Sequence, residues 1–197
     1  MAIVETIAGI YRLINKAAPS RGPGDYPQLA TVDAAGVART RLVILRGFDA
    51  PQRRVWVCTN VFAKKVAQLT DHTTAEMTLW LARPRVQLRL LCTWQIARAE
   101  TADPALQRLR DEEWQRQSPY AKVLYHWPAG TQDPAEVLAR LPSPQQAEAL
   151  PMPVGYCLLV GTITRIDALQ LTRPLHHRWV YEWDAVNNAW QGARRLP

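Results

Sequence analysis

Strand-forming segments of this chain follow one another across short turns, without the crossover helices that a parallel sheet requires. Leu29–Val32 and Val37–Leu45 are rich in apolar and β-branched residues. They flank a short turn that contains Gly36, which can take the positive φ of a tight hairpin turn. Val86–Ala97 follows Met77–Leu81 in the same way. Consecutive hairpins of this kind predict a mainly β fold, a mostly antiparallel barrel with peripheral helices.

Further strands are predicted at residues 55–59 and 154–166, and residues 178–195 are predicted to form a C-terminal hairpin. Three aromatic residues alternate along the first strand of that hairpin and give it one aromatic face. They are Trp179, Tyr181 and Trp183. An apolar surface of this size is expected to be buried, either in the core or against a partner.

Helical patterns lie outside these strands. Isoleucines recur every three or four residues over residues 3–16 and predict an amphipathic N-terminal helix. Residues 62–70 predict one short helix. Asp103 and Pro104 are typical of an N-cap and a first helical residue, so a helix is expected from there to about Gln115.

The segment of about residues 103–153 is predicted to be a helical and loop excursion. Its part from residue 118 onward contains seven prolines, and the one further helix expected there lies near Pro134–Arg140. The segment also contains tyrosine and tryptophan, which is typical of folded structure and not of a linker. We therefore interpret residues 1–197 as a single domain.

The charge of the chain is asymmetric. The formal net charge is +7, and the whole excess lies in residues 1–100, with 14 basic and 7 acidic side chains. Such an excess is compatible with nucleic acid, an anionic membrane surface, a phosphorylated ligand or a solvated basic surface. Basic residues occur at most in pairs, without the interleaved aromatics that favour single-stranded nucleic acid. No apolar stretch approaches the roughly 18 residues of a membrane helix.

Several common sites find no support in the sequence. There is no GxGxxG after a strand, no P-loop, no GxSxG and no HExxH. Three cysteines lie far apart without a CxxC pair, which disfavours a zinc knuckle or a disulfide framework and favours a reducing cytoplasm. The N-terminus has no basic region typical of a secretory signal. His176 and His177 have no third ligand at a telling spacing, so no metal site is predicted.

One set of residues is suited to a phosphorylated ligand. Arg41 lies in a predicted strand, Cys58 and Thr59 end the next long strand, and Lys64 and Lys65 follow at the start of the short helix. A helix N-terminus offers free N–H groups and a positive dipole, and two lysines add formal charge. The alternative is that both lysines are solvated and that Cys58 is a small buried hydrophobe.

The order of these segments resembles the pyridoxamine 5′-phosphate oxidase family of FMN-binding split barrels. The segments are LATVDAAGVARTRLVILRGFD, VWVCTNVFAKKVAQL, MTLWLARPRVQLRLLCTWQIA and the C-terminal LHHRWVYEWDAVNNAWQGARRLP. The resemblance covers most of residues 27–98 and 175–197. It implies a six-stranded antiparallel split β-barrel, FMN as the cofactor, and a homodimer with FMN at the interface.

The resemblance also implies the residues that contact FMN. The assigned residues are Arg41, Leu42, Val43 and Ile44 along the flavin, Cys58 and Thr59 beside it, Lys64 and Lys65 at the phosphate, Gln87 at the polar edge of the ring, and Arg178 near the ring. In a dimer, Arg178 would contact the FMN held by Arg41 of the partner subunit and Lys65 of the partner subunit. His176 is a candidate contact for the substrate.

Some positions depart from the family pattern. Pro174 stands where the oxidases carry a substrate-binding arginine, and Ala63, Cys58 and Val86 replace a serine, a tyrosine and an arginine. Oxidation of pyridoxamine 5′-phosphate is therefore not expected. The expected function is an FMN-dependent oxidoreductase that takes a hydride from a small substrate at flavin N5. The alternatives are a non-catalytic flavin carrier or sensor, and a basic barrel that binds nucleic acid.

Overall fold

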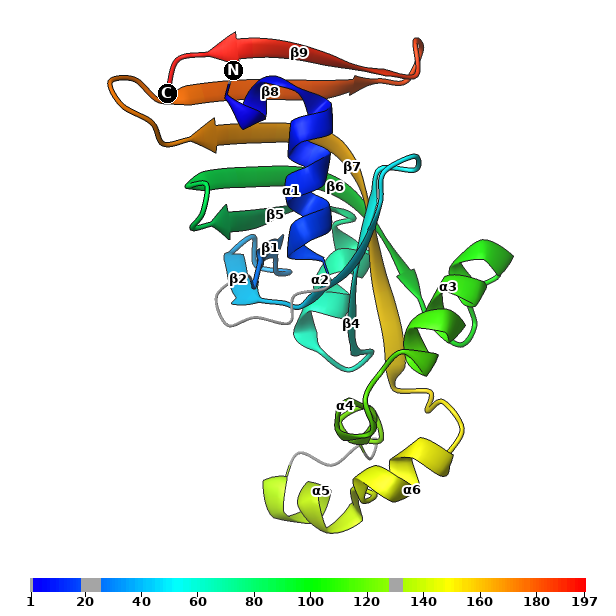
Figure 1. Ribbon diagram of the computed structural model, residues 1–197. Coiled ribbons are helices and arrows are strands. Elements are labelled where there is room, and N and C mark those ends of the chain that lie inside the picture. The colour runs from blue at the N-terminus through cyan, green and yellow to red at the C-terminus, as the bar shows by residue number, and fades with distance from the viewer. Residues whose placement is uncertain (1, 19–25, 128–132) are drawn as a thin grey trace. The chain divides into compact units, whose positions relative to one another are not determined.

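Antiparallel hairpins dominate the computed structural model, which describes residues 2–18, 26–127 and 133–197 (Figure 1). The chain divides into two compact units. Unit 1 comprises Met1–Val57, Gln68–Gln95 and Val160–Pro197, and unit 2 comprises Cys58–Ala67 and Ile96–Leu159. Each unit is described by itself below.

The described residues form nine strands. They are β1 (Gln28–Val32), β2 (Ala38–Leu42), β3 (Leu45–Asp49), β4 (Arg54–Asn60), β5 (Thr74–Leu81), β6 (Val86–Ala97), β7 (Tyr156–Gln170), β8 (His177–Asp184) and β9 (Ala189–Arg195). The sheet order is β2-β1-β5-β6-β7-β4-β3, and the β8–β9 hairpin pairs with β7 through β8. The predicted mainly β, antiparallel class is confirmed, whereas the predicted number of six strands is too low.

The prediction of one strand over Val37–Leu45 is wrong, because the chain changes partners within this run. β2 pairs with β1 up to Leu42, and Leu45 already pairs with Val57 of β4. Gly47 lies in β3, opposite Trp56 and beside a bulge. A Cβ atom at Gly47 would overlap the Trp56 ring, so glycine is required there for close packing.

The N-terminal helix is interrupted at Thr6. Ile3–Glu5 forms a short 3₁₀ helix (η1), and α1 spans Ile7–Ala17 with the Thr6 side chain accepting a hydrogen bond from the Gly9 N–H. The buried side of α1 carries the spaced apolar residues that predicted it. They are Ile10, Leu13, Ile14 and Ala17.

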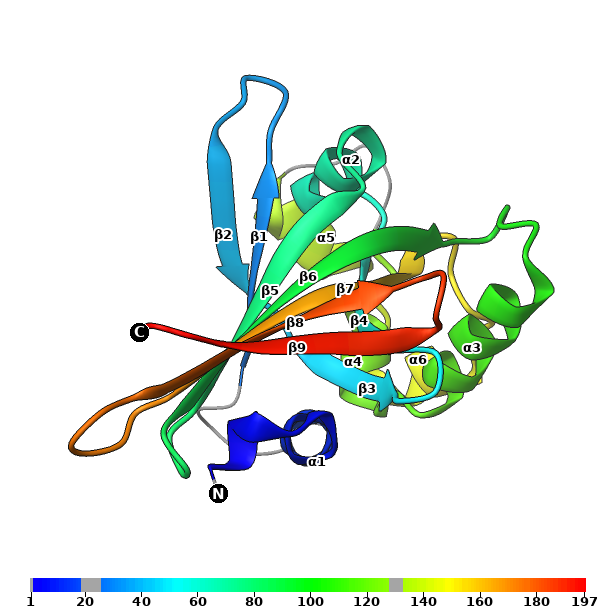
Figure 2. The ribbon, with the colours of Figure 1, turned by 90° about the horizontal axis from the view of Figure 1, so that it is seen from above.

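The aromatic face of β8 is covered within unit 1, where β8 and β9 run side by side (Figure 2). Tyr181 is buried, and its hydroxyl donates to the Val4 carbonyl at 3.0 Å. The guanidinium of Arg53 stacks on Trp183, 3.7 Å from the ring centroid. The N-terminal segment and Arg53 thus cover Tyr181 and Trp183 on this face within unit 1.

The described residues of unit 2 form four helices in addition to the first half of α2 (Lys64–Asp71). They are α3 (Pro104–Gln115), α4 (Pro119–Val123), α5 (Pro134–Arg140) and α6 (Pro144–Ala149). The predictions for α2, α3 and α5 are confirmed within two residues at each end, whereas α4 and α6 were not predicted. Trp114, Tyr125 and Tyr156 form a buried cluster with Cys58 and Met152 against it.

All three cysteines are free thiols. Cys92 in unit 1 and Cys157 in unit 2 are fully buried, and Cys58 is half-buried. Within the described residues, no group of three or more His, Cys, Asp or Glu side chains is placed to hold a metal ion. None of the helices in this part of the chain has the length and apolar character needed to cross a membrane.

Candidate functional site

Arg41 is the predicted site residue with the most developed surroundings. It lies in the strand β2 and is half-buried on the face that carries Leu29 and Thr31. Its Nη1 donates to the Leu29 carbonyl at 3.1 Å and to Thr31 Oγ1 at 2.6 Å, and its Nη2 donates to Gln68 Oε1 at 3.0 Å. These contacts hold the guanidinium in one orientation within unit 1.

The partners of Arg41 are all neutral. Within the described residues, no carboxylate lies at ion-pair distance from its guanidinium, and burial lowers its pKa from the ordinary arginine value. An arginine remains protonated despite such a shift. A half-buried cation without a carboxylate partner gains most from an anionic ligand, so this position is suited to bind one.

The residues after Arg41 alternate between exposure and burial. Leu42 is 63% exposed and Ile44 is 39% exposed, whereas Val43 is buried and its N–H donates to the Pro27 carbonyl. Two apolar side chains of the predicted flavin-lining run are therefore available to a ligand or a partner.

Gln87 lies on the other face of the sheet. It is directly opposite Trp80 in the β5–β6 ladder, on the outward face that also carries Arg89. Leu90 lies on the opposite face of β6 from Gln87. It belongs to a row of paired residues that runs across the sheet through Met77 and Leu29 to Arg41, so all four lie on the same face. Gln87 and Arg41 thus do not converge within unit 1.

Arg178 shares the outward face with Gln87 and has a carboxylate partner. Its Nε and Nη2 donate to the two carboxylate oxygens of Asp167 at 3.0 and 2.8 Å, and its Nη1 donates to the Leu196 carbonyl. Arg89 lies 3.7 Å from Asp167 and continues the network to Glu76. The Arg178 guanidinium lowers the pKa of Asp167.

The predicted residues of unit 2 lie at the end of β4 and the start of α2. Thr59 is buried, and Cys58 Sγ is 3.1 Å from the Tyr156 hydroxyl oxygen and 3.5 Å from Gln117 Nε2. Cys58 therefore makes a polar contact with the aromatic cluster through the Tyr156 hydroxyl.

Lys64 is exposed and Lys65 is half-buried, both in the first turn of α2. Burial raises the pKa of Cys157 to about 12, and the nearby charge of Lys65 opposes that rise. Lys65 therefore lies close enough to the interior of unit 2 to act on a buried thiol electrostatically.

His176 lies in the exposed connection between β7 and β8. Its Nδ1 is 3.0 Å from the Thr172 carbonyl oxygen, so the ring closes this connection locally. No second predicted site residue contacts His176 in the part of the chain that the structure describes.

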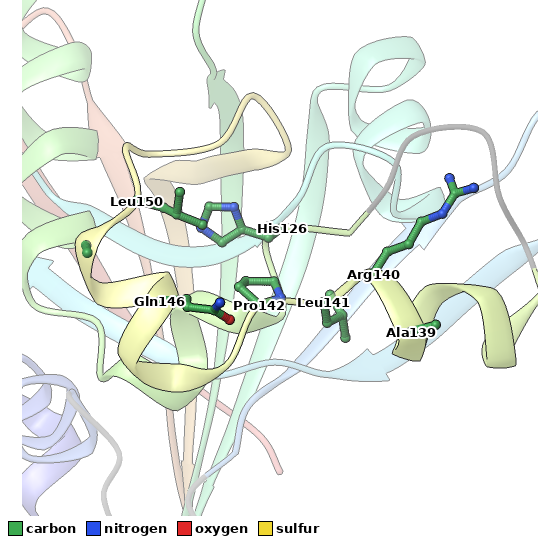
Figure 3. Close-up of a pocket in the computed structure, with 8 residues that line it drawn as sticks. His126, Ala139, Arg140, Leu141, Pro142, Gln146 and Leu150 are labelled. Atoms are coloured by element: carbon green, nitrogen blue, oxygen red, sulfur yellow. The ribbon is translucent and has the colours of Figure 1, made fainter.

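Unit 2 also contains an open hollow of about 690 Å³ between α5, α6 and His126 (Figure 3). Arg140 pairs with Glu136, and the Gln146 side chain completes the capping box with Ser143, whereas His126 Nε2 is buried without a hydrogen-bond partner among the described residues. None of the predicted site residues is among the eight that line it.

Sequence reasoning missed Thr31 and Gln68 as partners of Arg41. They lie 10 and 27 residues from it along the chain, on another strand and on a helix. Neither residue has a sequence pattern that distinguishes it from an ordinary polar residue of a strand or helix, so only the fold reveals the contact.

Comparison with known proteins supports the resemblance noted in the sequence. Residues 11–98 match the family described as "Pyridoxamine 5'-phosphate oxidase, FMN-binding domain". The chain is 27% identical over 149 residues to pyridoxine/pyridoxamine 5'-phosphate oxidase 2 of Arabidopsis thaliana, covering 74% of this chain and 73% of that protein.

Two crystal structures confirm the fold. A pyridoxamine 5'-phosphate oxidase-related, FMN-binding protein from Nostoc punctiforme is 22% identical, with a TM-score of 0.81 over 100% of both chains. PhzG from Burkholderia lata, in complex with tetrahydrophenazine-1-carboxylic acid, is 21% identical, with a TM-score of 0.73 over 97% of this chain and 92% of that one. Both cover the split barrel and the helical excursion.

Proposed function

We propose that this chain, a relative of the pyridoxamine 5′-phosphate oxidase FMN-binding family, binds FMN as an oxidoreductase that accepts a hydride from a small substrate. The observation that carries the proposal is the half-buried guanidinium of Arg41, held by neutral partners. FMN carries a phosphate with a charge near −2 at neutral pH, which is the type of group that such a cation favours.

The other assigned residues have matching chemistry. Lys64 and Lys65 add charge for the phosphate at the start of α2. The amide of Gln87 can donate to and accept from the polar edge of the ring. Arg178 would place positive charge near N1 and C2=O, where negative charge collects on reduction. The bound flavin would supply the hydride acceptor, and the protein residues bind and orient it.

A homodimer is part of the proposal. Arg41 lies on one face of the sheet, and Gln87 and Arg178 lie on the other, so one flavin is more readily contacted by residues of two subunits. The exposed apolar side chains of Leu42 and Trp80 on the outward face support burial against a second copy. A cytoplasmic location is proposed from the unpaired cysteines.

Purification tests the proposal. A yellow protein that releases FMN on denaturation is expected, and a colourless protein that fails to take up added FMN would refute cofactor binding. Anaerobic addition of candidate reductants then separates an oxidoreductase from a carrier or sensor, because only the enzyme bleaches at a rate set by the substrate. Bound nucleic acid without flavin would favour the remaining alternative.

Pyridoxamine 5′-phosphate is expected to be a poor substrate. Pro174 lacks the cationic side chain that the resembled oxidases use at this position, and an arginine–phosphate contact is among the stronger contacts in substrate binding. A coupled peroxide assay with the FMN-loaded protein should show little or no turnover. Robust turnover would show that another residue replaces the missing arginine.

A further inference from the structure

We infer that Gln68 is a positioning residue that fixes Arg41 for an anion while leaving its positive charge uncompensated. The inference rests on the proposed function, since the anion it serves is the phosphate of FMN. Gln68 lies in α2, belongs to unit 1 with Arg41, and is only 8% exposed. Thr31, the third member of the contact, is 4% exposed.

The three side chains form a closed ring of hydrogen bonds. Arg41 Nη1 donates to Thr31 Oγ1 at 2.6 Å, the Thr31 hydroxyl donates to Gln68 Oε1 at 2.6 Å, and Arg41 Nη2 donates to the same oxygen at 3.0 Å. Because the amide nitrogen of glutamine cannot accept a hydrogen bond, the amide must present its oxygen to both donors. The ring therefore permits one orientation of each group.

The ring uses one edge of the guanidinium and leaves another available. Nη1 and Nη2 each donate once into the ring, and the other Nη1 hydrogen goes to the Leu29 carbonyl. The Nε–H and the second Nη2–H have no partner among the described residues. These two donors lie side by side in the planar group, an arrangement that matches two oxygens of a phosphate.

The neutrality of Gln68 decides how much of the Arg41 charge is left for a ligand. Three other arginines of unit 1 pair with carboxylates, Arg39 with Asp33, Arg89 with Glu76, and Arg178 with Asp167. A glutamate at position 68 would accept the same two hydrogen bonds and would also cancel the charge of Arg41. The amide keeps the geometry and leaves the charge for the ligand.

Two substitutions separate geometry from charge. Gln68→Glu keeps both acceptor contacts and adds a negative charge, whereas Gln68→Met removes the contacts at similar volume. Gln52→Glu is the matched control, because Gln52 is exposed in the turn between β3 and β4 of unit 1 and receives the same change of net charge. FMN and riboflavin are titrated into each flavin-free protein by fluorescence, and thermal unfolding is recorded.

Gln68→Glu is expected to weaken FMN binding about 10-fold or more, with riboflavin binding unchanged and thermal stability equal to or above that of the natural protein. Gln68→Met is expected to weaken FMN binding and also to lower thermal stability, and Gln52→Glu to change neither. An unchanged ratio of FMN to riboflavin affinity in Gln68→Glu would overturn the inference.

The failure of the proposed function is distinguishable from the failure of this inference. If the natural protein binds neither flavin, the proposed function is wrong, and inorganic phosphate then serves as the probe. The inference expects phosphate to raise the unfolding temperature of the natural protein and of Gln52→Glu more than that of Gln68→Glu. An equal effect on all three would overturn it.

Discussion

Two arginines of the candidate site differ in what surrounds their charge. Arg41 has neutral partners only among the described residues, and Arg178 has both oxygens of Asp167. Both are always protonated, but the field of Arg178 is largely compensated by its neighbour. At the residue scale, Arg41 is therefore the stronger anchor for an anion.

The two lysines at the start of α2 are expected to discriminate between flavins by their phosphate. Lys64→Ala combined with Lys65→Ala should weaken FMN binding by about 10-fold to several hundred-fold and leave riboflavin binding nearly unchanged. Parallel titrations with the two flavins measure the difference. Equal losses for both flavins would place the lysines away from the phosphate.

Arg178→Met tests the contact with Asp167 through pH. The lowered pKa of Asp167 stabilises the folded protein at pH values above its ordinary pKa of 3.8, and that contribution is lost as the pH falls through the folded-state pKa. The variant should be less stable by about 1 kcal/mol near pH 7, after allowance for the exposure of Arg178. Thermal unfolding from pH 3 to pH 8 should show this difference shrinking at the acidic end.

The same variant tests the proposed flavin contact. If Arg178 also acts on the ring, the midpoint potential of bound FMN should fall in Arg178→Met, because reduced flavin loses more stabilisation than oxidised flavin. A potential that stays unchanged in an FMN-loaded protein would leave Arg178 with its structural role beside Asp167 alone.

At the scale of elements, prolines in the excursion begin helices more often than they interrupt them. Asp103, Ser118, Asp133 and Ser143 each cap a helix whose next residue is proline. The Asp103-Pro104 start and the helix near Pro134 were predicted, but the Ser-Pro starts of α4 and α6 were not, because helices of five and six residues are too short to show apolar periodicity.

The hairpins could be predicted because their turns and their alternation are local properties of the sequence. The β8–β9 pairing and the turn between β5 and β6 follow the prediction closely. The break at Val43 could not be predicted from the sequence, because it depends on the distant strand β4, which pairs with Leu45. The contact of Gln68 with Arg41 is of the same non-local kind.

The bulge in β3 gives a test at this scale. Gly47→Ala should destabilise the protein by about 1–3 kcal/mol or more, because the added Cβ overlaps the Trp56 ring. Chemical denaturation measures the loss. Combining Gly47→Ala with Trp56→Leu should cost less than the sum of the two single changes, whereas simple additivity would show that the overlap is relieved elsewhere.

At the scale of the whole molecule, the candidate flavin contacts could not be assembled from the sequence, because motif order says nothing of sheet faces. Arg41 lies on the face of Leu29, and Gln87 and Arg178 lie on the outward face. A site made from both sets is most readily completed by a second copy of the chain, which is why dimerisation and flavin binding are proposed together.

Trp80→Glu tests the outward face as a dimer contact. Trp80 is exposed beside Gln87, and a carboxylate there would be desolvated in an interface, so a shift from dimer to monomer is expected. Light scattering during size-exclusion chromatography measures the mass. Val186→Glu, at the exposed tip of the β8–β9 hairpin, is the control and should leave the mass unchanged. A natural protein that is already monomeric would contradict the proposal.

The three thiols allow local unfolding to be measured in the natural protein without any added label, because they differ in burial and in unit. Cys92 lies buried in unit 1 and Cys157 lies buried in unit 2, so a thiol reagent reaches each only when its unit opens. The half-buried Cys58 should react first and mark the fast phase. Mass spectrometry that follows the modification of Cys92 and Cys157 separately would then give the opening free energy of each unit. Equal values would indicate that the units unfold as one cooperative body, and different values that they unfold in sequence.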